Sequence, residues 1–123
     1  MKIYVTHSNS FDFKNELYIP LRNSNLNNIH SITLPHDNSS EQFNSKDYLK
    51  KCDLVIAEVS FPSTGQGIEL GWANLYDIPI VCVYKKGTKF SGSIKSVSNN
   101  FIEYENSKDM IAKLSNYIEE ILK

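Results

Sequence analysis

The sequence predicts an α/β protein: a single-domain, doubly wound, parallel five-stranded sheet of the flavodoxin-like or Rossmann-like type, with helices on both faces. Strand-like and helix-like segments alternate along the whole chain, which favours a parallel sheet with crossover helices. Two strand-like segments, 54–59 and 79–84, are apolar throughout apart from Glu58, as strands buried on both faces are. A strand order of 2-1-3-4-5 would bring the loops after the first and third strands together at the switch point, where such sheets bind ligands.

Length, charge and composition limit the classes of function. The 123 residues suffice for one domain, spanning 1–123. A net charge of −1 gives no electrostatic reason to expect nucleic acid or a membrane surface as a partner. No signal-like segment precedes the first strand and no apolar run approaches membrane-spanning length, so we expect a cytoplasmic protein. Cys52 and Cys82 have no metal-ligand spacing and are expected to be buried thiols in a reducing compartment.

The part of the chain before the central strand is expected to hold two strands and two helices. Pro20 lies within the first helix and is expected to kink it or end it early. Residues 23–28 are polar and are expected to form a loop, and 35–44, polar and without a pattern, are a candidate lid or specificity loop. The expected elements are a strand at 2–6, a helix at 11–21, a strand at 29–34 and a short helix at 46–52 that Ser45 could cap.

The second half of the chain has a clearer pattern. Residues 107–123 carry apolar side chains at spacings of three and four, which predicts an amphipathic helix with Ser107 and Asp109 at its start. The other expected elements are a strand at 54–59, a helix that begins at Ile68, a strand at 79–84, a short helix or loop at 90–97 and an edge strand at 100–104.

The stretch 53–75, DLVIAEVSFPSTGQGIELGWANL, is expected to organise the rest of the chain. Its apolar strand runs into SFPSTGQG, whose proline and glycines predict a tight loop, and helix-forming residues follow. The loop would bring backbone N–H groups and the positive end of the helix dipole to the carboxyl end of the strand. The glycine spacing is neither that of a Walker A loop, which needs a lysine, nor that of a dinucleotide-binding turn.

Glu69 is expected in the first turn of that helix and admits two interpretations. An acid at this position is common because it complements the helix dipole, which should also keep the carboxylate ionised. Alternatively, a carboxylate among small residues can attack a sugar carbon and form a glycosyl-enzyme intermediate. The spacing alone leaves both open.

The segment PSTGQGIELGWA resembles the signature P-S-x-G-x-G-x-E-x-G-x-A of the nucleoside 2-deoxyribosyltransferases and the related 2'-deoxynucleoside 5'-phosphate N-hydrolases, and the preceding DLVIAEVS is also similar. The resemblance covers residues 1 to about 98 and is strong in the central block. It implies that Glu69 is the catalytic nucleophile and that Ser63 binds the 5' phosphate of the substrate. Gly65 and Gly67 would leave room for the substrate to approach.

The same resemblance assigns further candidates around the first strand. Tyr4 matches an active-site tyrosine and is a candidate catalytic residue, and Ser8 matches a serine that holds the phosphate. Ser10 stands where those enzymes place an arginine, and it is a candidate for substrate binding. Without the resemblance, Tyr4 is an ordinary strand aromatic and the two serines are turn residues or helix caps.

Two further implied roles come from other parts of the chain. The family's catalytic aspartate, which assists the departing base, falls at Ser45 by strict count, and Asp47 is the candidate catalytic residue that could replace it. Ser91, in FSGSIK, resembles a serine that reaches the phosphate in the neighbouring subunit's site. The match implies a homodimer in which Ser91 completes the partner's pocket. Otherwise Asp47 is a solvated helix residue and Ser91 caps a surface helix.

Other polar residues have no assigned role. Glu58, inside the central strand, must face the pocket, pair with a cation or lie near the end of the strand. The three histidines have no metal-ligand spacing, and His36 could either touch a base or lie exposed.

The sequence therefore predicts an enzyme, either a nucleoside deoxyribosyltransferase or a nucleotide N-glycosidase, which is a hydrolase. It would cleave or transfer the N-glycosidic bond of a (deoxy)nucleoside or nucleoside 5'-monophosphate through a covalent glycosyl-glutamate intermediate, with no metal or cofactor. Two alternatives stay open. One is a non-catalytic module that binds a nucleotide signal. The other is a glycohydrolase of NAD-like dinucleotides, because a strand followed by a Ser/Asn-rich loop and a distant glutamate also resembles TIR-type domains.

Overall fold

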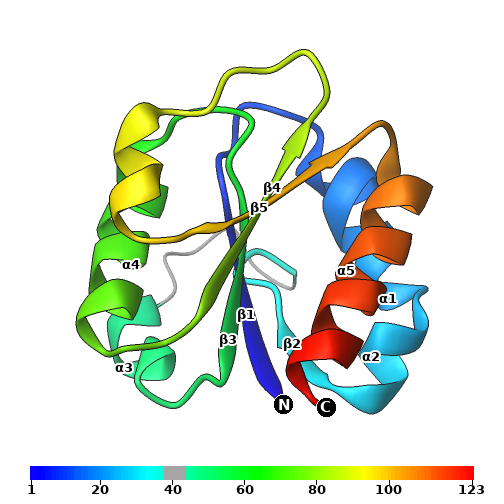
Figure 1. Cartoon of the computed structure of the whole chain (residues 1–123), viewed down its shortest axis with the longest axis horizontal. Coiled ribbons are helices and arrows are strands. Elements are labelled where there is room, and N and C mark those ends of the chain that lie inside the picture. The colour runs from blue at the N-terminus through cyan, green and yellow to red at the C-terminus, as the bar shows by residue number, and fades with distance from the viewer. Residues whose placement is uncertain (38–43) are drawn as a thin grey trace.

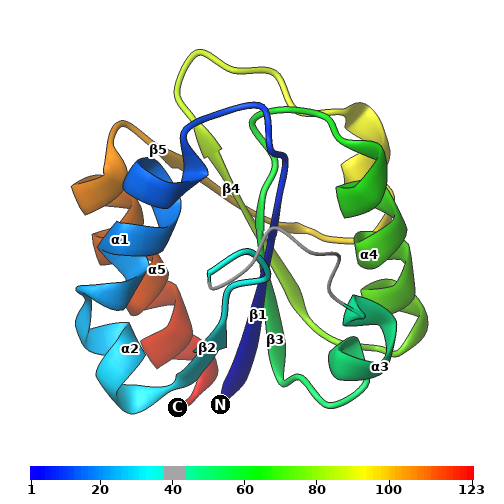
Figure 2. The same cartoon turned by 180° about the vertical axis from the view of Figure 1, so that it is seen from behind.

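In a computed structural model of the protein, which describes residues 1–37 and 44–123, five parallel strands form one sheet in the order β2-β1-β3-β4-β5 (Figure 1 and Figure 2). The predicted fold class and strand order are confirmed. The strands are β1 (Lys2–His7), β2 (Ser31–Thr33), β3 (Leu54–Glu58), β4 (Ile80–Lys85) and β5 (Asn100–Tyr104).

Helices cover both faces of the sheet, as a doubly wound fold requires (Figure 1). One layer consists of the π-helical turn η1 (Lys14–Tyr18), α1 (Ile19–Arg22), α2 (Asn25–Ile29) and α5 (Ser107–Ile121). The other layer consists of α3 (Ser45–Leu49), α4 (Thr64–Leu75) and the 3-10 helix η2 (Gly92–Ser96). Among the described residues, none of the helices is both long and apolar enough to cross a membrane.

The central strands contribute side chains to two hydrophobic clusters, because successive residues of a strand point to opposite faces. Ile3 and Val5 of β1 belong to the cluster under α1 and α5, together with Ile56 of β3. Tyr4 and Val55 belong to the cluster under α4. Both faces of β1 and β3 are thus covered, which explains why every residue of the two strands except Lys2 is buried.

The structure corrects the prediction of a loop at 23–28, because α2 occupies Asn25–Ile29. The asparagines there have low helix propensity, but Leu26 is buried in the core, and this tertiary contact favours a helical turn. The predicted helix at 11–21 is irregular, with a π-helical turn before Pro20. Pro20 has no N–H for the carbonyl of Glu16 four residues earlier, and that carbonyl accepts a hydrogen bond from Ser107 Oγ at 2.7 Å.

The start of α4 is a second correction. The predicted tight loop ends sooner, because Ser63 is the extended N-cap residue and the helix begins at Thr64. The first two glycines of the signature, Gly65 and Gly67, therefore lie in the first turn of the helix, although their composition predicted a loop. Glu69 is the sixth residue of α4, so the prediction that it lies in the first turn, next to the helix terminus, is wrong.

Two smaller differences concern other helices. Ser107 does not cap α5; Asn106 does, because its side chain accepts a hydrogen bond from the Asp109 backbone N–H at 2.9 Å. Asn44, not Ser45, is the N-cap residue of α3. The candidate lid at 35–44 lies in part, at 38–43, outside the described residues.

Candidate active site

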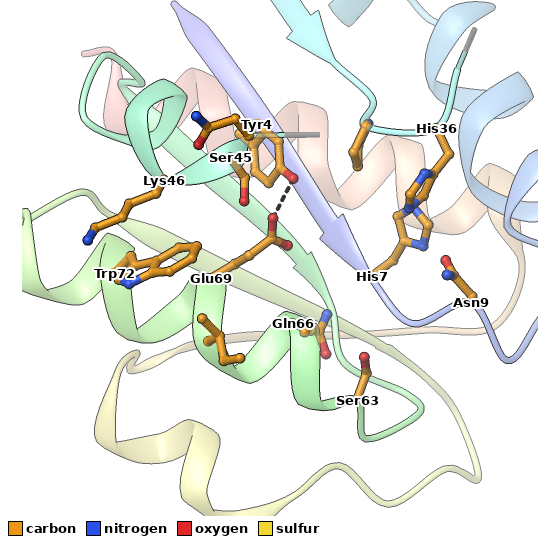
Figure 3. Close-up of a pocket in the computed structure, with 14 residues that line it drawn as sticks. Tyr4, His7, Asn9, His36, Ser45, Lys46, Ser63, Gln66, Glu69 and Trp72 are labelled. Atoms are coloured by element: carbon orange, nitrogen blue, oxygen red, sulfur yellow. Dashed lines mark hydrogen bonds between the residues drawn. The ribbon is translucent and has the colours of Figure 1, made fainter. Parts of the chain in front are cut away.

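A pocket of about 620 Å³ lies beside the carboxyl end of β1, between the start of α3 and the first turns of α4 (Figure 3). His7 and Asn9 line it from the end of β1 and the loop that follows. Ser63 and Gly65 line it from the end of the loop after β3 and the start of α4. Because the strand order reverses between β1 and β3, these two loops meet at the edge of the sheet where open α/β proteins bind ligands.

Glu69 is held in this pocket by two hydroxyl groups of β1. The phenol of Tyr4 donates a hydrogen bond to Glu69 Oε2 at 2.6 Å (Figure 3). The hydroxyl of Thr6 donates to Glu69 Oε1 at 2.7 Å. Tyr4 and Thr6 are two residues apart on a strand, so their side chains point to the same face and reach the same carboxylate. Each carboxylate oxygen thus has one fixed donor.

The Tyr4 phenol remains a donor at any physiological pH. Burial raises the pKa of Tyr4 far above its usual value, and the neighbouring Glu69 carboxylate raises it further. The side chain of Ser45, at the start of α3, is another hydrogen-bonding partner of Tyr4. The tyrosine therefore connects α3 to the carboxylate on α4.

Gln66 fixes the first turn of α4 against the ends of β1 and β3. Its side-chain amide donates to the carbonyl of Glu58 at 2.6 Å and to the carbonyl of Thr6 at 3.2 Å. Gln66 is buried, so these bonds satisfy an amide that would otherwise be costly to remove from water. The bonds hold the helix that carries Glu69 in register with the strand that carries its donors.

His7 lines the pocket but both of its ring nitrogens have partners. Nδ1 lies 2.9 Å from the carbonyl of Ser8, and Nε2 lies 2.7 Å from the phenol of Tyr18. Burial lowers the pKa of His7, so the neutral ring is favoured. His36 lies next to it, with ring centroids 5.8 Å apart, and also lines the pocket.

Lys46 and Trp72 line the pocket on the side opposite His7 and His36 (Figure 3). The Lys46 ammonium is 5.7 Å from the centroid of the Trp72 ring. Trp72 follows Glu69 by three residues on α4, so the two side chains lie on the same side of the helix.

The structure brings together four of the residues predicted for the site: Tyr4, Ser63, Gly65 and Glu69 all line the pocket. The other five do not line it: Gly67, Ser8, Ser10, Asp47 and Ser91. The hydroxyl of Ser8 accepts a hydrogen bond from the backbone N–H of Ser10 at 3.0 Å and so closes the turn after β1. Asp47 is exposed, and its carboxylate accepts a hydrogen bond from Asn44 at 3.4 Å. Ser91 is the N-cap residue of η2.

Sequence reasoning missed several residues of the pocket. Thr6, which does not line the pocket but donates to Glu69 in it, was also missed and could have been found, because it shares a strand face with Tyr4. Trp72 could also have been found, because residues three apart on a helix lie on the same side and Trp72 follows Glu69 by three. Lys46 and Gln66 gave no such signal, because their roles depend on how α3 and α4 pack on the sheet.

Glu58 is a buried carboxylate at the end of β3, below the pocket loops. Its two oxygens accept hydrogen bonds from the backbone N–H of Ser60 at 2.6 Å and from the Ser60 hydroxyl at 2.9 Å, and the Tyr104 phenol donates to it as well. Glu58 was expected to face the pocket, pair with a cation or lie near the end of the strand, and the third of these is observed. No group of three or more metal-ligating side chains occurs within residues 1–37 and 44–123.

Comparisons with known proteins return the family that the sequence resembles. No protein-family model matches the chain. A protein of Trichoplax adhaerens whose name assigns it to the 2'-deoxynucleoside 5'-phosphate N-hydrolases is 31% identical over 75 residues, covering 57% of this chain and 52% of that protein. The 5-hydroxymethyl-dUMP N-hydrolase of Tetraodon nigroviridis is 32% identical over 72 residues, covering 55% of this chain and 51% of that protein. The alignments thus span about half the length of these relatives, and they confirm the predicted resemblance.

A solved structure supports the fold over nearly the whole chain. The structure of a CMP N-glycosidase of Clostridium botulinum matches with a TM-score of 0.65 and covers 94% of this chain and 99% of that one. The sequence identity is 22%, so this likeness concerns the fold.

Proposed function

We propose that the protein cleaves the N-glycosidic bond of a nucleoside 5'-monophosphate or nucleoside, with Glu69 as the nucleophile. The observation that carries the proposal is the placement of the Glu69 carboxylate in a pocket between two hydroxyl donors of β1, at 2.6 and 2.7 Å. The names of the similar proteins support it, because they describe N-hydrolases of 2'-deoxynucleoside 5'-phosphates.

The chemistry proceeds in two steps. An oxygen of Glu69 attacks C1' of the sugar, the C1'–N bond breaks, and its electron pair leaves with the base, which gives a covalent glycosyl-glutamate ester. A water molecule then hydrolyses the ester at C1' and restores the carboxylate, and the proton released in this step balances the charge of the departed base. If a second base attacks instead of water, the same intermediate leads to transfer.

The two hydroxyl donors suit this role. They hold the carboxylate at a defined position, so less conformational entropy is lost when it reaches the geometry for attack. The hydroxyl groups are neutral, so they leave the carboxylate its negative charge, which the developing positive charge at C1' requires.

The start of α4 is where a 5' phosphate would bind. Ser63 and Gly65 line the pocket there, at the N-terminus of α4, whose first backbone N–H groups have no intrahelical acceptor. A phosphate at this point would leave the sugar near Glu69, further along the same helix.

A second candidate function is nucleotide binding without turnover. Two observations favour it: Glu69 is the sole carboxylate among the described residues that line the pocket, and Ser45 stands where the sequence resemblance places the family's aspartate. A non-catalytic protein would bind the same ligands and release no base.

The test is to incubate the protein with a panel of nucleosides, 2'-deoxynucleoside monophosphates and NAD, and to measure free base by chromatography. Glu69→Gln keeps the shape of the side chain and loses its charge, so we expect folding and binding to persist and base release to disappear. Glu119→Gln, at an exposed position on α5, is the matched control. A 2-fluoro-substituted deoxynucleotide should add the mass of the fluorinated sugar to the peptide that contains Glu69. Base release by Glu69→Gln at the wild-type rate would show that the covalent mechanism is wrong.

We also propose that the protein is a homodimer in which Ser91 completes the partner's pocket. Ile68 and Leu75 support this, because they are 49% and 73% exposed on α4 and lie seven residues apart, on one stripe of the helix. Ile68 also lines the pocket, and η2, which follows Ser91, lies beside α4 (Figure 1). A second copy packed on this stripe would therefore approach the pocket.

A further inference from the structure

The positions along α4 divide the pocket into two ends. Ser63 lies just before the first turn, Glu69 lies six residues later and Trp72 three residues after that. At a rise of about 1.5 Å per residue, the helix start is about 9 Å from Glu69 and Trp72 is about 4.5 Å beyond it. If the proposed function holds, C1' lies at Glu69, and a phosphate at the helix start leaves the Trp72 end for the base.

The groups at the Trp72 end suit an aromatic ring with acceptor atoms. Trp72 is half-buried and offers an indole ring, and the Lys46 ammonium lies over one face of that ring (Figure 3). Base–aromatic contacts and a charged hydrogen-bond donor are the usual means of binding an unpaired base.

The described pocket also needs a group that stabilises the departing base. Asp47 does not line it, and Glu69 is occupied as the nucleophile. His7 has partners at both ring nitrogens. His36 lies at the opposite end from Trp72 (Figure 3). Lys46 is thus the cationic donor on the side where the base would lie.

We infer that Trp72 and Lys46 form the nucleobase subsite, and that Lys46 donates a hydrogen bond to a carbonyl oxygen next to the glycosidic nitrogen, as in the O2 of a pyrimidine. This inference rests on the proposed function and adds the substrate class. When the C1'–N bond breaks, its electron pair stays on the base. The Lys46 ammonium stabilises the resulting anion at the carbonyl oxygen, and the proton from the hydrolytic water then neutralises it.

The chain contains a matched control for Lys46. Lys50 follows Lys46 by four residues, at the end of α3, and Tyr76 follows Trp72 by four residues, at the end of α4. The Lys50 ammonium is 5.3 Å from the centroid of the Tyr76 ring. The two lysines thus have similar aromatic neighbours and similar exposure, but Lys50 does not line the pocket. Lys46→Met and Lys50→Met compare the same change of charge inside and outside the subsite.

Binding can be measured without turnover, because Trp72 is the one tryptophan of the chain and its fluorescence reports on this end of the pocket. In a Glu69→Gln background, we expect dUMP to quench the emission and 2-deoxyribose 5-phosphate to leave it nearly unchanged. Equal responses to the two probes would overturn the assignment of the base to Trp72. So would an unchanged emission when equilibrium dialysis shows that dUMP binds.

Kinetics test the role of Lys46 in the departure of the base. We expect Lys46→Met to lower kcat/KM for dUMP by roughly 10- to 100-fold, the loss of one charge-assisted hydrogen bond, and Lys50→Met to have no effect. With 4-nitrophenyl 2-deoxyriboside 5-phosphate, whose leaving group needs little assistance, Lys46→Met should change the rate by less than about 3-fold. Equal loss on both substrates, or no loss on dUMP, would refute the role. A wild-type protein that releases no base would refute the proposed function and this kinetic role, while the fluorescence result would still decide where the base binds.

Discussion

At the scale of single residues, the two hydroxyl donors of Glu69 are the feature that connects the fold to the chemistry. Tyr4 and Thr6 come from one strand and Glu69 from a helix more than sixty residues later, so the site exists only when β1 and α4 are packed together. Glu69 is half-buried, so its carboxylate loses part of its contact with water, and the two hydrogen bonds replace part of that hydration.

Removing either donor should therefore reduce activity more than stability. We expect Tyr4→Phe and Thr6→Val each to lower kcat/KM for base release by roughly 10- to 100-fold, because each removes a hydrogen bond to a charged group worth about 1.5–3 kcal/mol. In a double-mutant cycle, the two effects should be non-additive, because both donors orient the same carboxylate. Tyr84→Phe, on β4 and away from the residues that line the pocket, is the control. Wild-type kcat/KM in both single variants would mean that the hydroxyl groups do not serve the nucleophile.

At the scale of elements, strands were easier to predict than helix termini. The predicted strand at 100–104 has the observed bounds of β5, and the continuous apolar runs gave β3 and β4 within one residue. The bounds of β3 and β4 follow from side chains that must be buried on both faces, whereas β5 is an edge strand whose residues are mostly exposed or half-buried. The start of α4 was missed because Gly65 and Gly67 have low helix propensity, and only the packed structure shows that the first turn includes them.

The same distinction explains how much of the site was predictable. Glu69 and Ser63 were found through the signature at 62–73 and Tyr4 through the similarity of the first strand to the same family, and all three line the pocket. Lys46 reaches the pocket because α3 packs against α4, which no local pattern of the sequence records. In this protein, the sequence predicts which segments lie near the site, whereas the packing of the helices determines which side chains of those segments enter it.

Glu58 links three elements, and its charge makes their junction sensitive to pH. It lies on β3 and accepts a hydrogen bond from Tyr104 of β5. Ser60 connects it to β4, because the Ser60 hydroxyl donates to Glu58 and accepts from the Lys85 backbone N–H at 2.8 Å. Burial raises the pKa of Glu58, although the hydrogen bonds from Tyr104 and Ser60 act in the opposite direction. The folded state therefore binds this proton more tightly than the unfolded state does.

The sign of the pH effect follows from this raised pKa. The contribution of Glu58 to stability is fully present below the pKa of an unfolded glutamate, about 4.3, and is lost as the pH rises through the higher pKa of the folded state. Glu58→Gln removes this titration. We expect the difference in melting temperature, variant minus wild type, to increase between pH 4 and pH 8. Glu119→Gln should show no such trend. A difference that stays constant over this range would indicate that Glu58 has the same pKa in both states.

At the scale of the whole molecule, the two faces of the sheet have different tasks. The layers lie on opposite faces of the sheet (Figure 2): that of α1, α2 and α5 closes the core. Residues of α3 and α4, in the other layer, also line the pocket. Exposed apolar side chains occur on both layers, for example Ile19 on α1 and Leu75 on α4, which are 50% and 73% exposed. Among the exposed large apolar side chains of residues 1–37 and 44–123, Ile68 of the α4 stripe is the one that lines the pocket. Assembly through α4 would therefore couple the oligomeric state to the site.

The homodimer proposal predicts that the apolar stripe on α4 controls assembly, and that exposed apolar side chains elsewhere do not. We expect the wild-type protein at micromolar concentration to sediment at twice the chain mass of 14.1 kDa. Leu75→Lys should yield monomers, because it places a charge in an apolar contact, while Ile19→Lys on the opposite layer should leave the dimer intact. Ser91→Ala should keep the dimer but weaken binding of a phosphorylated ligand by roughly 10-fold, the loss of one hydrogen bond to an anion. A monomeric wild-type protein would exclude a shared pocket, and a dimeric Leu75→Lys variant would place the contact on another face of the molecule.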